Sequence, residues 1–165
     1  MQPPRKIYIA PSKINSAGRG VFAQEKIASG ELIESCPTVA LGGAKDRQYL
    51  RKTNLVNYYF LWGEDREQVA ICLGWGSVYN HSFSPNAQYE KFMEEERMDF
   101  YALRDIQEGE EITVNYNGIP TDTRRLRIPG IPADAGGPLP QMVPRPVAGL
   151  LRRVRLITNR FSGNQ

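Results

Sequence analysis

The sequence predicts a single mostly-β domain followed by an extension rich in proline and glycine. Short apolar runs with β-branched or aromatic residues alternate with clusters of Gly, Pro, Asn and Ser over the first two thirds of the chain. This pattern is typical of many short strands joined by turns. A chain of 165 residues with 41% hydrophobic side chains can bury one substantial core. We therefore expect one domain of catalytic size.

Several strands are expected in order along this domain. They cover residues 5–10, 20–23, a strand that starts at 30–34, and then 69–73, 87–92, 98–103 and 112–116. Turn formers separate them at 11–19 and 106–111, and the acidic stretch 94–97 is predicted to be a solvated hairpin tip. Residues 46–57 are expected to hold a helical turn or two. Residues 74–86, with closely spaced glycines, serines and a proline, favour irregular backbone.

The C-terminal region, residues 119–165, is predicted to be separate from a domain at 5–118. Six of the twelve prolines lie between 129 and 149, interleaved with glycines, which is typical of an extended or disordered linker. In 147–161, apolar residues fall on one helical face against arginines, which predicts a basic amphipathic helix. That helix docks on the core, contacts an acidic partner, or is unstructured alone.

Composition argues against several classes of site. One histidine and two distant cysteines give no metal-ligand spacing, so no metal is expected, and neither is a Ser-His-Asp or Cys-His triad. Cys36 and Cys72 lie in apolar stretches and are interpreted as buried reduced thiols, with a disulfide as the open alternative. With no apolar run of about 18 residues and no signal-peptide core, we expect a soluble, intracellular protein without a membrane partner.

The net charge of +3 hides an asymmetry. Residues 120–165 hold 8 of the 21 Lys and Arg but only 2 of the 18 Asp and Glu, so residues 1–119 carry a net charge of −3. The acidic balance of that first part predicts an attraction to Lys-rich proteins. The basic tail is only a weak indication of binding to nucleic acid or an anionic surface.

Three motifs carry the chemistry. Residues 17–22, AGRGVF, place a G-x-G between two strands and not before a helix, which argues against a dinucleotide fingerprint. The glycines do leave a backbone that a cofactor can approach. The other motifs are 79–86, YNHSFSPN, and 109–116, GEEITVNY. Taken singly, they are equally consistent with a tight turn, a structural histidine and core tyrosines.

Together, in this order and at these separations, the three motifs resemble SET domains over about residues 6–118. They are similar to the small stand-alone SET proteins of viruses and bacteria. The resemblance implies a mostly-β, β-clip-like fold of small sheets around a pseudoknot. In it, the strand leading to Tyr116 threads a loop near Asn80 and His81. It also implies a protein-lysine methyltransferase that uses S-adenosylmethionine.

The resemblance further implies roles for individual residues. Tyr116 resembles the catalytic tyrosine, and Asn86 is expected to brace the knot. Five residues are expected to hold the cofactor: Gly18, Arg19, Gly20, Asn80 and His81. Three further tyrosines match aromatic positions of the lysine channel: Tyr58, Tyr79 and Tyr89. Methyl transfer needs a neutral, well-aimed amine, which positioning and a narrow aromatic channel supply without a metal.

The expected partner is a lysine-containing protein with a basic tail, such as a histone, in the cytoplasm of a bacterium or the nucleus or cytoplasm of a eukaryote. No cysteine follows Cys72, so the zinc-binding segment that closes the channel in many SET enzymes has no counterpart. The amphipathic segment 147–161 or a second copy in a homodimer is expected to close it. A SET-like module that binds a lysine-bearing partner without turnover is the alternative.

Overall fold

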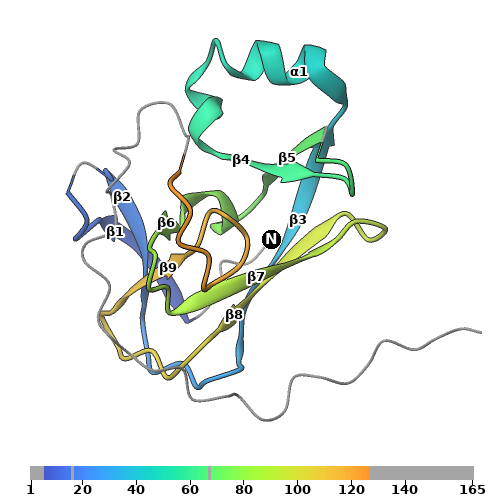
Figure 1. Cartoon of the computed structure of the whole chain (residues 1–165). Helices are drawn as coiled ribbons and strands as arrows, with labels where there is room; N and C mark the ends of the chain where they lie inside the picture. Colours follow the sequence, from blue (N-terminus) through green and yellow to red (C-terminus); the bar gives the residue numbers. More distant parts are fainter. Residues whose placement is uncertain (1–5, 16, 67, 127–165) are drawn as a thin grey trace, which may run out of the picture.

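The computed structural model describes residues 6–15, 17–66 and 68–126, which form a mostly-β domain (Figure 1). Its strands are β1 (Ile7–Pro11), β2 (Arg19–Ala23), β3 (Leu32–Leu41), β4 (Tyr59–Trp62), β5 (Gln68–Cys72), β6 (Asn80–His81), β7 (Ala87–Phe92), β8 (Arg97–Ala102) and β9 (Glu111–Val114). Helix α1 (Gly43–Leu50) and the 3-10 helices η1 (Asn54–Asn57) and η2 (Gly76–Val78) connect them. No helix in the described ranges is long and apolar enough to span a bilayer.

Two sheets carry the fold. One has the order β1-β2-β9-β6 and the other has the order β4-β5-β3-β8-β7. Strand β6 pairs with β9 in parallel, with Asn80 opposite Thr113 and His81 opposite Val114, while every other strand pair in the described part is antiparallel. In Figure 1 the orange segment after β9 lies beside the green segment of η2 and β6. Two of the three sequence motifs therefore meet at this short parallel pair.

Both sheets contribute to one core. The strands β8 and β9 supply Met98, Phe100, Ile112 and Val114, all fully buried. Cys36 and Cys72 are also buried and are free thiols, as predicted. Burial raises the pKa of the Cys72 thiol to about 12, so this group is inert near neutral pH.

A bulge in β3 turns a carboxyl group into this core. The register with β8 shifts between Leu32 and Glu34, so that Ile33 and Glu34 are both buried. The Glu34 carboxylate accepts a hydrogen bond from the backbone N–H of Trp75 at 3.0 Å and another from the Tyr79 hydroxyl at 3.2 Å. Burial raises the pKa of Glu34 despite these bonds. The carboxyl therefore anchors the loop that leads into β6.

Most predicted strands are confirmed, and the segment 74–86 is irregular apart from η2 and β6, as predicted. The strand β4 was not predicted. Helix α1 begins at Gly43, three residues before the expected helical region at 46. The predicted linker at 129–149 and the amphipathic helix at 147–161 lie outside the described residues. The described part of that C-terminal region, 119–126, packs on the domain.

Candidate active site

The crossing of two chain segments builds the centre of the site. The backbone N–H of Tyr116 donates to Nδ1 of His81 at 3.2 Å, and the two rings lie 5.2 Å apart. One residue along, the N–H of Ser82 donates to the Val114 carbonyl at 3.0 Å. The fold therefore joins the N-H-S segment to the tyrosine that follows β9, as the resemblance to SET domains implied.

Asn80 connects all three motifs. Its Nδ2 lies 2.9 Å from the Arg19 carbonyl, 3.1 Å from Oγ of Ser12 and 2.9 Å from Oε1 of Glu111, and it donates toward each. The Glu111 carboxylate also accepts from the Ser12 hydroxyl at 2.7 Å and from the Lys13 N–H at 2.8 Å. The amide nitrogen of Asn80 is therefore fully engaged, which leaves its Oδ1 as the group that a ligand can address.

The two glycines of the first motif differ in what surrounds them. Gly18 has φ +73°, a conformation that favours glycine, and a Cβ there would meet nothing within 4 Å. At Gly20 a Cβ would lie 2.2 Å from Oε1 of Glu111 and 3.1 Å from Nδ2 of Asn80. The open space is therefore on the Gly18 side, while Gly20 allows β2 to approach Asn80 and Glu111 closely.

We expect Gly20→Ala to lower the affinity for S-adenosylmethionine by about tenfold or more, because the methyl group displaces the Glu111–Asn80 pair beneath the glycine backbone. Isothermal titration calorimetry measures this affinity. Gly42→Ala is the matched control, because Gly42, like Gly20, has no left-handed φ, and the atom nearest to its Cβ position is an Asp46 carboxylate oxygen at 4.0 Å. Unchanged cofactor affinity in the Gly20 variant would contradict this assignment.

His81 is buried and presents one unused donor. Because Nδ1 accepts the Tyr116 N–H, the neutral ring carries its proton on Nε2. That Nε2 is buried and has no hydrogen-bond partner among the described residues. Burial lowers the pKa of His81 to about 4. A buried donor without a partner calls for an explanation, and an acceptor atom of a bound ligand would satisfy it.

The stability of the protein is expected to fall between pH 6.5 and about 4, because the unfolded chain protonates His81 at its ordinary pKa of 6.5 while the folded chain resists protonation down to about 4. The loss is of the order of 3 kcal/mol. Urea unfolding across this range should show a flatter profile for His81→Asn, whose Oδ1 still accepts from Tyr116. Parallel profiles for the two proteins would refute this origin of the pH dependence.

Five tyrosines line a pocket of about 1070 Å³: Tyr58, Tyr59, Tyr79, Tyr89 and Tyr116. The Tyr116 hydroxyl donates to the Tyr79 carbonyl at 2.8 Å. Burial raises the pKa of Tyr116 well above its ordinary range and raises that of Tyr89 to about 12. These two phenols are therefore protonated at neutral pH.

The structure distinguishes the four tyrosines that the sequence had singled out. Tyr58 is partly exposed at the mouth of the pocket, and Tyr89 is half-buried with its ring 5.2 Å from that of Phe60. Tyr79 reaches the pocket but turns its hydroxyl to Glu34, and its ring packs on Phe100 at 4.6 Å. The hydroxyl of Tyr79 is thus committed to the core, and its carbonyl is the group it offers to Tyr116.

The segment after the tyrosine supplies a wall that the sequence did not reveal. Residues 117–119 and 124–126 line the pocket. Asn115 Nδ2 donates to the Asp122 carbonyl at 2.7 Å, and Asn117 Nδ2 donates to the Arg124 carbonyl at 2.8 Å. Leu126 is buried. Part of the C-terminal side of the pocket is therefore closed without cysteines, while the predicted closing segment 147–161 lies outside the described residues.

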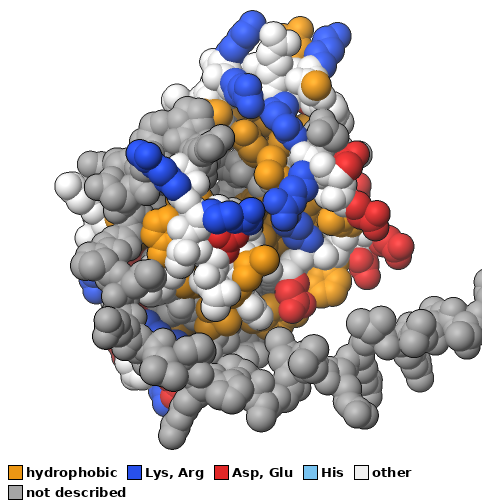
Figure 2. Space-filling view, in the orientation of Figure 1, with side chains coloured by type: hydrophobic (Ala, Val, Ile, Leu, Met, Phe, Trp, Pro, Cys, Tyr) orange, Lys and Arg blue, Asp and Glu red, His pale blue; other side chains and the backbone are white. Residues whose placement is uncertain are grey.

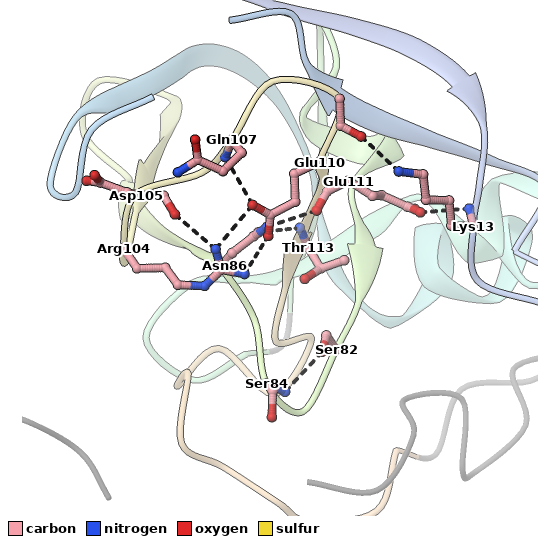
Figure 3. Close-up of polar contacts among 11 residues, drawn as sticks. Lys13, Ser82, Ser84, Asn86, Arg104, Asp105, Gln107, Glu110, Glu111 and Thr113 are labelled. Atoms are coloured by element: carbon pink, nitrogen blue, oxygen red, sulfur yellow. Dashed lines mark hydrogen bonds and ion pairs between the residues drawn. The ribbon is translucent and has the colours of Figure 1, made fainter. Parts of the chain in front are cut away.

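Asn86 holds β9 through contacts with Glu110, Glu111 and Thr113 (Figure 3). Its Nδ2 donates to the Glu111 carbonyl at 2.8 Å and to the Glu110 carboxylate at 3.1 Å, while its Oδ1 accepts the Thr113 N–H at 2.8 Å. Burial would raise the pKa of Glu110. Hydrogen bonds from Arg104, from the Gln107 N–H and from Asn86 outweigh burial and lower this pKa to about 2.

Several residues of the site were not singled out from the sequence. Ser12 and Glu111 complete the Asn80 network, and Glu34 anchors Tyr79. Glu111 was quoted as part of the third motif, which was the available signal for it. Ser12 and Glu34 carry no motif signal, because their roles depend on contacts 68 and 45 residues away along the chain.

Comparison with known proteins gives the class of this fold and site. Residues 18–117 match the family model described as the SET domain. The chain belongs to the SET-domain family.

Several known proteins are similar to this chain. A histone-lysine N-methyltransferase of Schizosaccharomyces pombe, described as H3 lysine-37 specific, is 34% identical over 60% of this chain and 66% of its own length. The crystal structure of a Plasmodium falciparum chain, described as a candidate histone methyltransferase, is 36% identical with a TM-score of 0.52 over 70% of this chain and 95% of that one.

A structure described as ctPRC2 in an autoinhibited conformation bound to S-adenosylmethionine has a TM-score of 0.58 and 25% identity over 69% of this chain. The match covers 15% of that larger chain. This chain thus spans a little under two thirds of the fission yeast protein and a small part of the PRC2 chain.

Proposed function

We propose that this protein is a protein-lysine methyltransferase that uses S-adenosylmethionine. The observation that carries the proposal is the position of Tyr116, whose backbone is bonded to His81 and whose hydroxyl lies at a tyrosine-lined pocket. Tyr116 thus links two parts of the site. One part contains His81 and the G-x-G backbone, and the other is the pocket, which suits a long aliphatic amine. Membership of the SET family supports both halves of the proposal.

The residues present fit the proposed cofactor. Gly18 leaves open space beside an accessible backbone. Among the described residues, no donor is bonded to Asn80 Oδ1 and no acceptor to the buried His81 Nε2. We propose that these three residues, with Arg19 and Gly20, hold it. When bound, S-adenosylmethionine supplies an electrophilic methyl group on a sulfonium sulfur.

The pocket supports a role in preparing the amine. Aromatic faces attract an alkylammonium, and burial disfavours its charged form, so a lysine side chain there loses its proton to water more easily. The Tyr116 phenol stays protonated because burial raises its pKa, so it does not act as the base. We propose that its hydroxyl and the Tyr79 carbonyl orient the amine nitrogen, since orientation supplies a large part of such a rate enhancement.

The proposal is tested by incubating the full chain with methyl-labelled S-adenosylmethionine and either a cell lysate or a histone panel. Mass spectrometry then identifies the labelled residues. Methyl groups on lysine side chains are the expected result. If calorimetry shows cofactor binding but no protein is labelled under any condition, the chain is a SET module without turnover and the proposal fails.

A further inference from the structure

The pocket proposed to receive the lysine has a positively charged border. Four cationic residues line it: Arg66, Lys91, Arg124 and Arg125. Among the described lining residues none is Asp or Glu. Figure 2 shows blue side chains gathered around a hollow with orange walls, while red side chains gather to the right, over the tip of the β7–β8 hairpin. This arrangement is unexpected for a site that takes a cationic side chain.

One nearby carboxylate neutralises only part of this charge. Asp122 pairs with Arg124 at 2.5 Å, and the charge of Arg66 also lowers the pKa of Asp122, after the larger effects of Arg124 itself. Within the described ranges, the four lining cations and the Asp122 carboxylate leave an excess of three positive charges. Burial, and then the charge of Arg66, lower the pKa of Lys91, whose Nζ donates to the Leu61 carbonyl at 2.6 Å. Arg66 and Lys91 are therefore close enough to repel each other, and both charges act on a ligand in the pocket.

The acidic side chains that the structure describes lie outside the pocket lining. Glu64 and Asp65 precede Arg66 but are exposed and do not line the pocket, and neither does the acidic hairpin tip at 94–96. Salt screens exposed charges beyond about 8 Å at physiological ionic strength. The four cations of the border therefore affect the binding of a peptide more than the net charge of −3 over residues 1–119.

We propose that this pocket selects lysines flanked by acidic residues, a substrate class distinct from the basic tail that the net charge predicts. The inference rests on the proposed function. Carboxylates on either side of the lysine lie against the cationic border, and they compensate the repulsion of the incoming ammonium. The same cations favour the neutral amine once it is inside, because a like charge nearby lowers an ammonium pKa. The same four side chains thus increase the affinity for a lysine flanked by acidic residues and favour the deprotonation of that lysine.

The test uses three peptides with one central lysine, whose flanking positions are all glutamate, all glutamine or all arginine. Binding to the full chain is measured by fluorescence anisotropy, and methyl transfer is measured separately with labelled cofactor. The glutamate peptide should bind about tenfold more tightly than the glutamine peptide, and the arginine peptide should bind most weakly. The preference should shrink as salt rises.

Charge-reversal variants test which residues cause the preference for the glutamate peptide. Arg66→Glu and Arg125→Glu should each reduce the advantage of the glutamate peptide, and the double variant should reverse the order. Lys45→Glu is the matched control, because Lys45 is exposed on α1 and does not line the pocket. It changes the net charge equally and should leave the order of the peptides intact.

The binding and transfer measurements separate the two proposals. Charge-selective binding without methyl transfer to any peptide would sink the proposed enzyme function and keep the acidic preference of the pocket. Methyl transfer with equal or better use of the arginine peptide would overturn the inference and keep the function. Equal shifts from Lys45→Glu and Arg66→Glu would also overturn it, because a general charge effect would then suffice.

Discussion

Methyl transfer by the Tyr116→Phe variant is expected to fall by about a hundredfold or more, since the substitution removes a hydroxyl fixed at the reacting end of the pocket. Cofactor affinity should change little. The bond from the Tyr116 N–H to His81 involves the backbone, and the contact between the two rings at 5.2 Å remains. Initial rates with a lysine-containing substrate measure the first effect, and calorimetry measures the second.

Tyr49→Phe is the matched control for this variant, because Tyr49 is exposed on α1 and lies outside the pocket lining. Its activity should equal that of the wild type. A wild-type rate for Tyr116→Phe would show that the hydroxyl has no part in transfer. Loss of cofactor binding in the same variant would instead assign Tyr116 a structural role at the crossing.

The sequence predicted which segments meet but not how they are joined. The order of the G-x-G, N-H-S and G-E-E-I-T-V-N-Y motifs allowed the crossing near Tyr116 to be predicted by resemblance. The hydrogen bonds from Asn80 to Arg19, Ser12 and Glu111 depend on residues up to 68 positions apart. Such partners follow from strand register, and no local pattern of residues encodes them.

The lysine side of the site was the harder part to predict. The strand β4 consists of four residues at the edge of its sheet, after a 3-10 helix, so it lacks the alternating pattern of a half-buried strand. Residues 117–126 contain Gly118, Pro120 and two arginines and resemble a linker in composition. They are held by side-chain amides of Asn115 and Asn117 bonded to backbone carbonyls, which a composition analysis does not detect.

The positions of the charges also proved more informative than the net charge of the domain. Net charge over residues 1–119 sums groups on every face of the domain. The structure separates an acidic hairpin tip at 94–96 from a pocket border made by Arg66, Lys91 and two arginines that follow residue 119. Arg124 and Arg125 were counted with the tail in the sequence, although they belong to the site in space.

Asn86→Ala should have the largest effect on stability, of the order of 3 kcal/mol, since it removes three hydrogen bonds from a side chain that is only 2% exposed. It also leaves the Thr113 N–H without its acceptor on β9. Urea unfolding measures the loss, with Asn54→Ala as a control at an exposed asparagine. A loss equal to that of the control would show that the clamp contributes nothing.

Asn86→Asp distinguishes hydrogen bonding from simple packing at this position, because it keeps the shape of the side chain. One carboxylate oxygen still accepts the Thr113 N–H, but the other replaces a donor that faces the Glu110 carboxylate and the Glu111 carbonyl. Repulsion should make this variant at least as unstable as Asn86→Ala at neutral pH. Acidification should restore part of the stability, since a protonated carboxyl donates again. If packing alone held β9, Asn86→Asp would unfold like the wild type at every pH.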